Sequence, residues 1–337
     1  MQAVLIAGGM GTRLRPLTLT RPKALLPLLN RPMILHLFER MPSFVDEVIV
    51  AGSHGVDKLR DFFAREDVGR PVEIVREKRP LGTGGCLKNL EDRIGGTFLA
   101  LNADVVSSVA LADLVAAHRR FGGVGAIALW EVEDPSAFGV VAMKGDRITK
   151  FVEKPGKGEA PSNLANAGAY ALEPDVLAAM SEGDTISLER DVFPKLVRKG
   201  LYGFPFTGYW ADAGTLEHFL HATEVLLLAR GSEVSRRASI LPAARLTKPL
   251  AVAADAQVGG DVGPVVTIGE SCVVEDARIV RSVLLPNVTV ARGARVEGSI
   301  LGEGCRIGPR AVVRGSIVAD RALVAENARV VDARVRA

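Results

Sequence analysis

The stretch Ala3-Val4-Leu5-Ile6-Ala7-Gly8-Gly9-Met10-Gly11 joins a short apolar run directly to a glycine-rich loop. An apolar run of this length followed by glycines predicts a buried strand that ends at the edge of a sheet. In an open α/β sheet, ligands bind outside the carboxyl ends of the strands. The loop that begins at Gly8 is therefore the first candidate binding site.

Strands and helices alternate through the first 228 residues. Apolar runs at 3–7, 47–51, 72–76, 98–101 and 126–132 predict strands. The segments 32–41, 56–65, 84–90, 111–121, 188–199 and 215–228 predict helices. This alternation predicts an α/β domain with a doubly wound, mostly parallel sheet. Several short apolar runs in 138–171 predict a local antiparallel addition.

The C-terminal region has a different composition. No aromatic residue follows Phe219, and no histidine follows His221. Serines recur every 17 residues at Ser282, Ser299 and Ser316, and Ala-Arg-Ile-like tripeptides recur at the same step from Ala277. A fixed period near 17 with inner steps of about six predicts a left-handed β-helix solenoid. A small β-sandwich is the alternative. We expect a catalytic domain at 1–228, a linker at 229–258 and the solenoid at 259–337.

Composition limits the possible partners of the chain. The 42 basic and 39 acidic residues among 337 leave a formal charge of +3, which argues against nucleic-acid binding. No apolar run approaches the ~18 residues of a membrane span, so no membrane partner is expected. The three cysteines, Cys86, Cys272 and Cys305, are far apart and have no metal-binding spacing. Buried thiols in a cytoplasmic protein are the simplest interpretation.

Five cations follow the glycine loop before any acidic residue appears. They are Arg13, Arg15, Arg21, Lys23 and Arg31, and the first acid is Glu39. Glycine amides together with clustered cations predict a phosphate site. The GxxxxGK[ST] loop of Walker A is absent, and Leu14 stands where a dinucleotide fingerprint has its third glycine.

These segments resemble the signature of the sugar-1-phosphate nucleotidyltransferases, also called nucleotide-sugar pyrophosphorylases. The resemblance rests on 8–18, on Arg21-Pro22-Lys23-Ala24-Leu25-Leu26-Pro27, and on Arg31-Pro32-Met33-Ile34. Further segments follow in the family's order: 81–85, 102–104, 138–141, 151–155, 166–170 and 208–215. The tail resembles the C-terminal domain of longer members. The whole chain looks most like mannose-1-phosphate guanylyltransferases with a left-handed β-helix, which implies a Rossmann-like nucleotidyltransferase fold.

The resemblance implies a role for each matching residue. Arg13 and Lys23 would be catalytic, clamping and neutralising the triphosphate. The nucleotide would lie against Gly8, Gly9, Gly11, Thr12, Arg13, Gly82 and Thr83. The sugar phosphate would bind at Gly139, Glu153, Lys154 and Asn166, and Mg²⁺ at Asp104 and Asp212. The family commonly has glycine where this chain has Ala103.

The implied reaction is transfer of a nucleotidyl group from an NTP to a sugar-1-phosphate, by in-line attack at the α-phosphorus. We expect GTP and mannose-1-phosphate as substrates. Glucose-1-phosphate thymidylyl- or uridylyltransferase and heptose-1-phosphate guanylyltransferase remain alternatives, and a non-catalytic regulatory paralogue is a different class. Because no histidine base follows His221, the tail is expected to support homo-oligomer contacts or to present an effector surface rather than to carry out acyl transfer. The five histidines are expected on helices or on the surface.

Overall fold

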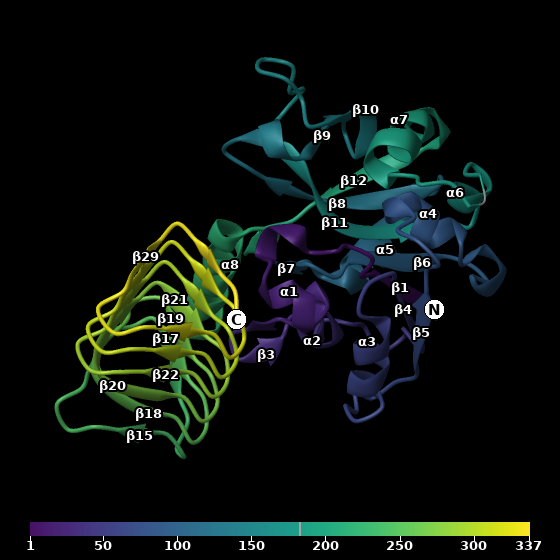
Figure 1. Cartoon of the computed structure of the whole chain (residues 1–337). Coiled ribbons are helices and arrows are strands. Elements are labelled where there is room, and N and C mark those ends of the chain that lie inside the picture. Colours follow the sequence, from purple (N-terminus) through teal and green to yellow (C-terminus); the bar gives the residue numbers. More distant parts are fainter. Residues whose placement is uncertain (182) are drawn as a thin grey trace. The chain divides into compact units, whose positions relative to one another are not determined.

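The computed structural model describes residues 1–181 and 183–337, and the chain divides into two compact units (Figure 1). The first unit comprises Met1–Met10 and Ile34–Trp210. The second comprises Gly11–Met33 and Ala211–Ala337. The cation-rich segment that follows the first strand therefore groups with the C-terminal region and not with the sheet.

A nine-stranded sheet in the order β5-β4-β1-β6-β11-β8-β12-β10-β9 forms the centre of the first unit. Its strands are β1 (Gln2–Ile6), β4 (Glu47–Gly52), β5 (Val72–Arg76), β6 (Phe98–Asn102), β8 (Gly125–Glu131), β9 (Gly139–Lys144), β10 (Arg147–Glu153), β11 (Leu164–Leu172) and β12 (Leu201–Pro205). The pairs within β5-β4-β1-β6 are parallel, as is β8 with β12. The doubly wound sheet is thereby confirmed. The antiparallel strand β11 lies between β6 and β8 rather than at an edge, and its apolar residues are buried.

In the first unit, the bounds of a helix agree with those predicted from the sequence where a capping residue or a glycine marks its end. They are α2 (Leu35–Phe38), α3 (Val56–Phe63), α4 (Gly82–Lys88), α5 (Leu111–Phe121), α6 (Asp175–Ala178) and α7 (Phe193–Leu196). Helix α5 has the predicted bounds and stops at Gly122, whose φ is 69°. The predicted helix at 188–199 is instead a π-helical turn, α7 and a 3-10 turn, because Pro194 lacks an amide hydrogen for a continuous helix. The helix predicted at 32–41 is reduced to α2.

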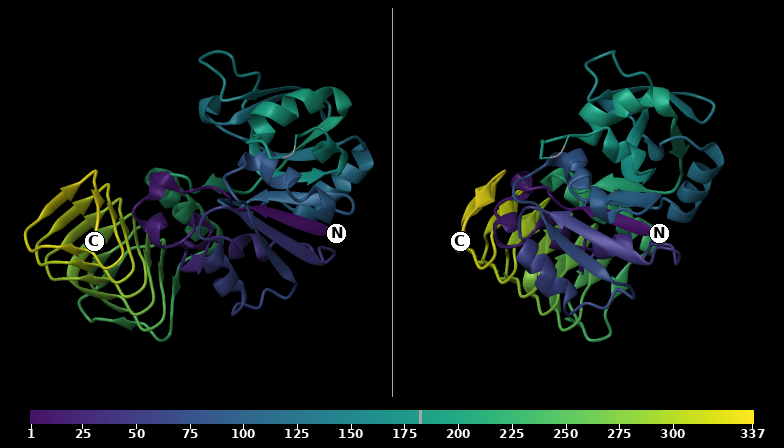
Figure 2. Two further views of the ribbon diagram at one scale, coloured as in Figure 1. Left: turned by 45° about the vertical axis from the view of Figure 1, so that its right-hand side comes forward. Right: turned by 90° about the vertical axis from the view of Figure 1, so that its right-hand side faces the viewer.

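Stacked coils of parallel strands form the bulk of the second unit (Figures 1 and 2). The strands are β14 (Glu233–Val234), β15 (Ser239–Ile240), β16 (Arg245–Leu246), β17 (Leu250–Val252), β18 (Gln257–Val262), β19 (Val266–Ile268), β20 (Val273–Val280), β21 (Ser282–Leu284), β22 (Thr289–Val290), β23 (Arg295–Glu297), β24 (Ile300–Leu301), β25 (Arg306–Ile307), β26 (Val312–Arg314), β27 (Ile317–Val318), β28 (Leu323–Val324), β29 (Arg329–Val331) and β30 (Arg334–Val335). Residues 17 apart pair in parallel register, as Val283 with Ile300 and Ile300 with Ile317. Parallel coils exclude the antiparallel β-sandwich and agree with the predicted β-helix; its left-handedness stays a prediction.

A column of buried serines connects successive coils. Ser299 N donates to Ser282 Oγ at 3.2 Å, and Ser316 N donates to Ser299 Oγ at 3.1 Å. Each hydroxyl also donates to the carbonyl two residues earlier, as Ser299 does to Glu297 O at 2.7 Å. The serine period read from the sequence therefore reflects the need to pair backbone groups buried at one corner.

Residues 233–252, within the expected linker, already take part in the coils. Strand β14 pairs with β17, which pairs with β19 in parallel register. Before this region, α8 (Leu216–Arg230) begins at the N-cap Thr215, whose hydroxyl accepts from His218 N. The division at 228 and 258 stays a prediction. Among the described residues, no helix combines the length and apolar character needed to cross a bilayer.

We expect Ser299→Ala to lower the free energy of unfolding by about 1–3 kcal/mol, because it leaves the buried Ser316 amide without its acceptor. Urea unfolding measured by circular dichroism checks this. The control is Ser239→Ala, which removes an exposed hydroxyl from a coil strand. Equal stability of the two variants would contradict a structural role for the serine column.

Candidate functional site

Arg13 and Asp212 lie together in the second unit. A Cβ placed on Gly214 would lie 2.9 Å from Arg13 Nη2 and 2.8 Å from Asp212 Oδ1. Gly214 N donates to Asp212 Oδ1 at 2.8 Å, and His218 Nδ1 lies 2.8 Å from Asp212 Oδ2. The turn before α8 thus presents a carboxylate and a guanidinium side by side. His218 was expected only as a helix or surface residue, and its contact with Asp212 is an addition.

Gly11 and Lys23 are packed against each other at the base of the same segment. Gly11 has a φ of 57°, and a Cβ there would lie 2.8 Å from the Thr18 methyl and 3.3 Å from Lys23 Cβ. Thr18 Oγ1 donates to Gly11 O at 2.8 Å. Lys23 is only 8% exposed, whereas Thr12 and Arg13 are exposed. Only glycine suits position 11, both for its conformation and for its space.

In the first unit, a buried carboxylate supports Gly8. A Cβ on Gly8 would lie 2.9 Å from Glu77 Oε1, whereas one on Gly9 would meet nothing within 4 Å. Glu77 Oε2 accepts from Leu81 N at 3.1 Å, and burial raises the pKa of Glu77. Glu77 therefore links the first glycine loop to the segment that begins at Leu81. No motif in the sequence marked it.

The glycines of 82–85 are required by packing. A Cβ on Gly82, whose φ is 74°, would lie 2.5 Å from Ile186 O. Gly84 N and Gly85 N both donate to Ile186 O, at 2.8 and 3.2 Å. Two of the amides in the segment expected to face a nucleobase are thus already paired with the chain itself.

A polar network connects Thr83 with Asn166. Thr83 Oγ1 donates to Glu189 Oε2 at 2.8 Å, and Tyr170 OH lies 3.5 Å from Glu189 Oε1. Asn166 Nδ2 donates to Tyr170 OH at 2.9 Å, and Asn166 Oδ1 accepts from Gly168 N at 3.0 Å. Glu189 was not among the candidate site residues expected from the sequence.

Glu153 is a half-buried carboxylate beside Gly139. A Cβ on Gly139 would lie 2.7 Å from Glu153 Oε2, and that oxygen accepts no hydrogen bond among the described residues. Burial, and then the Glu189 carboxylate, raise the pKa of Glu153. Lys154 Nζ lies 4.0 Å from Glu153 Oε1 and is largely exposed, and its φ of 48° is unusual for a side chain of this size. The pair therefore places an exposed ammonium beside a carboxylate whose Oε2 is enclosed by the chain itself.

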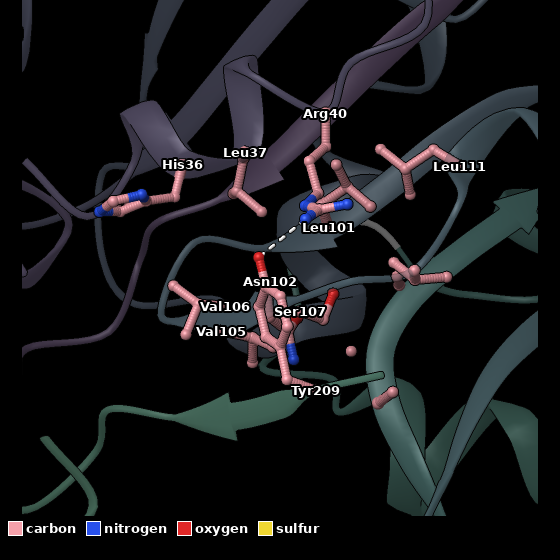
Figure 3. A pocket seen from close by; sticks show the side chains of 14 residues that line it. His36, Leu37, Arg40, Leu101, Asn102, Val105, Val106, Ser107, Leu111 and Tyr209 are labelled. Carbon is pink, nitrogen blue, oxygen red and sulfur yellow. Dashed lines mark hydrogen bonds between the residues drawn. The ribbon is translucent and has the colours of Figure 1, made fainter. Parts of the chain in front are cut away.

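Asn102, Ala103 and Asp104 follow strand β6. Ala103 N donates to Ile6 O at 3.1 Å and Ala103 is buried, so its methyl is accommodated in the turn. Asn102 borders a small pocket of about 20 Å³, whose wall includes the hydrogen-bonded pair Arg40 and Tyr209 (Figure 3). That volume suits one water molecule and is far below the ~300 Å³ of a ligand pocket. This cavity is therefore not a substrate site.

Asp104 belongs to the first unit and Asp212 to the second. Among residues 1–181 and 183–337, no group of three or more His, Cys, Asp or Glu side chains could hold a metal ion. Both oxygens of Asp212 are oriented by neighbours, and carboxylates are the hard donors that Mg²⁺ takes in small number, with phosphate oxygens and water completing the shell. The Asp212 carboxylate is of the kind that suits a divalent cation whose remaining ligands are phosphate oxygens and water.

Comparisons with known proteins agree with the resemblance drawn from the motifs. Residues 2–227 match the family described as Nucleotidyl transferase, and residues 246–337 match the GMPPB C-terminal domain. Mannose-1-phosphate guanylyltransferase 1 of Arabidopsis thaliana is 33% identical, with 91% of this chain and 88% of the relative covered. Mannose-1-phosphate guanyltransferase of Aspergillus oryzae is 35% identical with the same coverage. A solved putative glucose-1-phosphate thymidylyltransferase from Bacillus anthracis, in complex with a sucrose, matches with a TM-score of 0.61 and 25% identity, over 68% of this chain and 95% of that one.

We expect Glu153→Gln to stabilise the protein at neutral pH. A raised carboxyl pKa means that the folded state disfavours the ionised form, so the wild type loses stability as pH rises from the ordinary glutamate pKa of about 4.3 through the raised value. Above that window the variant should melt about 2–4 °C higher than the wild type. Below pH 4 the two should melt together.

Differential scanning fluorimetry across pH checks this, with Glu131→Gln as a control that neutralises an exposed carboxylate at the end of β8. A wild type that melts above the Glu153→Gln variant at neutral pH would contradict the buried, destabilising charge.

Proposed function

The chain belongs to the nucleotidyl transferase family, and from that premise we propose that it joins GTP to mannose-1-phosphate, giving GDP-mannose and pyrophosphate. The reaction class, nucleotidyl transfer from an NTP to a sugar-1-phosphate, is that of the family. The observation that carries the choice of substrates is the similarity to mannose-1-phosphate guanylyltransferases, which covers about nine-tenths of both chains.

The reaction forms one bond and breaks one. A phosphate oxygen of the sugar-1-phosphate attacks the α-phosphorus of the NTP, and the bond from that phosphorus to the α,β-bridging oxygen breaks. Pyrophosphate leaves with the bond's electron pair. No protein nucleophile is needed, so the chain's contribution is positioning and charge stabilisation.

On the nucleotide side, we assign Arg13 to the β- and γ-phosphates and Lys23 to the charge that develops during transfer. The planar guanidinium can bind two phosphate oxygens at once, and the ammonium acts as a point charge. Gly8, Gly9, Gly11 and Thr12 let backbone amides approach the phosphates. Gly82 and Thr83 are assigned to the base. The backbone of their segment is fixed by the hydrogen bonds that Gly84 N and Gly85 N donate to Ile186 O.

On the sugar side, we assign the Glu153 carboxylate to sugar hydroxyls and the Lys154 ammonium to the sugar phosphate. The exposure of the Lys154 ammonium, which lies 4.0 Å from Glu153 Oε1, supports these roles. Gly139, whose missing side chain leaves space for Glu153, is assigned to the sugar through its backbone, and Asn166 is assigned to a sugar hydroxyl.

A divalent cation serves this family, and we propose Mg²⁺ held by Asp104 and Asp212. When bound, it supplies positive charge that neutralises phosphate oxygens. Gly214 N, which donates to Asp212 Oδ1, and His218, which lies against Oδ2, keep the Asp212 carboxylate oriented.

We also place the protein in the cytoplasm, as a homo-oligomer joined through the β-helix. Three free buried cysteines support a reducing compartment. On the last strands of the tail, Leu323 is 70% exposed and Val331 is 47% exposed, which supports an apolar contact there.

The function is tested by pyrophosphate release with Mg²⁺, using four NTPs against mannose, glucose, galactose, N-acetylglucosamine and heptose 1-phosphates. Turnover with GTP and mannose-1-phosphate supports the proposal. Turnover with dTTP or UTP and glucose-1-phosphate, or with the heptose, replaces the substrate pair and keeps the reaction. Failure of every pair with a folded protein favours a sugar-1-phosphate outside this panel first, and a regulatory paralogue second.

We expect Lys23→Ala to lower kcat by at least about 10²-fold, the scale of losing one preorganised electrostatic contact. Steady-state kinetics checks this, with Lys157→Ala as a control that removes an exposed loop ammonium. An unchanged kcat removes Lys23 from the mechanism.

For the assembly, we expect light scattering to give a mass at least twice that of the chain. Leu323→Glu should reduce that mass by placing a charge in the apolar contact. A monomeric wild type contradicts the assembly role.

A further inference from the structure

Two carboxylates of the β-helix lie at the same corner of successive coils. Glu303 and Asp320 are 17 residues apart, which is the period of the coil register. Glu303 N donates to Asp320 Oδ1 at 2.8 Å, so the two positions are neighbours along the solenoid. Like charges stacked in this way repel each other, and the pair requires a cation between or beside them.

That cation is Arg21, from the cation-rich segment of the same unit. Arg21 Nη2 donates to Glu303 Oε2 at 2.9 Å and to Asp320 Oδ2 at 2.7 Å. Thr20 Oγ1 adds a bond to Asp320 Oδ2 at 2.6 Å. The Arg21 side chain is 18% exposed and that of Asp320 is 12% exposed, so this ionic contact is largely withdrawn from water, whereas the Glu303 side chain is 46% exposed.

The same geometry argues against a direct phosphate contact for Arg21. One guanidinium with two carboxylates carries a net charge of −1, which repels a triphosphate. The sequence alone left Arg21 undecided between surface charge, local pairing and phosphate binding. The contacts with Glu303 and Asp320 favour a role inside the protein.

The segment is also attached to the β-helix at its other end. Asn30 Nδ2 donates to Ile268 O at 3.0 Å, and Leu29 packs against Leu227, Ala251 and Val265. Lys23 and the backbone that carries it therefore lie between two attachments, at Arg21 and at Leu29–Asn30. Pro22, which separates Arg21 from Lys23, limits the backbone freedom that could absorb a displacement.

We propose that Arg21, Glu303 and Asp320 are positioning residues, through which late coils of the β-helix hold Lys23 in its catalytic geometry. The proposal rests on the proposed function, because it takes the role of Lys23 from there. The β-helix would then contribute to turnover within a single chain, in addition to any role in subunit assembly.

The test is a set of isosteric variants in the full-length chain, namely Asp320→Asn, Glu303→Gln, Arg21→Ala and Arg21→Lys. Glu326→Gln is the matched control, since it neutralises a carboxylate that pairs with Arg310 elsewhere on the same coils. Thermal melting identifies any variant that fails to fold. Hydrogen–deuterium exchange of peptides covering 11–33 reports the order of the segment independently of activity.

We expect Asp320→Asn to lower kcat about 10- to 100-fold, the scale of misplacing a catalytic group by about 1 Å, while KM for the sugar phosphate changes less than about 2-fold. Exchange within 11–33 should rise in Asp320→Asn and stay unchanged in Glu326→Gln. Arg21→Lys should recover part of the kcat lost in Arg21→Ala. The double variant Arg21→Ala/Asp320→Asn should be no slower than the slower single variant, within about 3-fold, because both remove one shared contact.

Unchanged exchange in 11–33 together with unchanged kcat overturns the proposal. Losses in kcat that multiply in the double variant also overturn it, because the two residues then act separately. A wild type that turns over no substrate pair refutes the proposed function instead, and the exchange measurement then decides whether the β-helix orders this segment.

Discussion

The parallel register of the coils is the constraint on which the second unit depends. A step of 17 residues places each buried serine directly against the backbone amide of the next coil, as Ser282 does for Ser299. The same step places Glu303 beside Asp320 and so creates a site for the Arg21 guanidinium. An irregular tail could not align two carboxylates on one cation. The repeat therefore connects a feature of composition, a period in small and apolar residues, to the placement of a cation-rich segment far away in the sequence.

In the first unit, the corresponding constraint is close packing around glycines and buried carboxylates. Gly8 leaves room for Glu77 and Gly139 leaves room for Glu153, and neither carboxylate has a cation close enough to compensate its burial fully. Such groups cost stability, because an ionised oxygen loses its hydration. Their placement next to segments assigned to the nucleotide and the sugar is consistent with sites that gain their partners only when substrate binds.

The sequence was sufficient to predict the bounds of those strands and helices that begin and end at local signals such as a glycine or a proline. Strand β5 and helix α5 have the predicted bounds, and the serine period predicted the stacked coils. Pro194 was present in the pattern and could have signalled the break that the structure shows, but the apolar spacing across 188–199 was read as one helix. The residues of the candidate site likewise divide into those that a sequence motif predicts and those that only the fold brings together. Motifs identified Arg13, Lys23 and Glu153, whereas Glu189 and the partners of Arg21 come from distant segments. Glu303 and Asp320 do share a phase of the repeat, and that signal could have drawn attention to them.

Nucleotidyl transfer between GTP and mannose-1-phosphate is reversible, so the proposed activity can be followed from either side. Phosphorus NMR of GDP-mannose incubated with pyrophosphate, Mg²⁺ and the purified full-length protein tests it most directly, because the reverse reaction must regenerate both substrates. The account predicts that GTP and mannose-1-phosphate appear in equal amounts as GDP-mannose and pyrophosphate are consumed. Release of GMP or GDP without GTP would contradict it, since hydrolysis would then replace transfer.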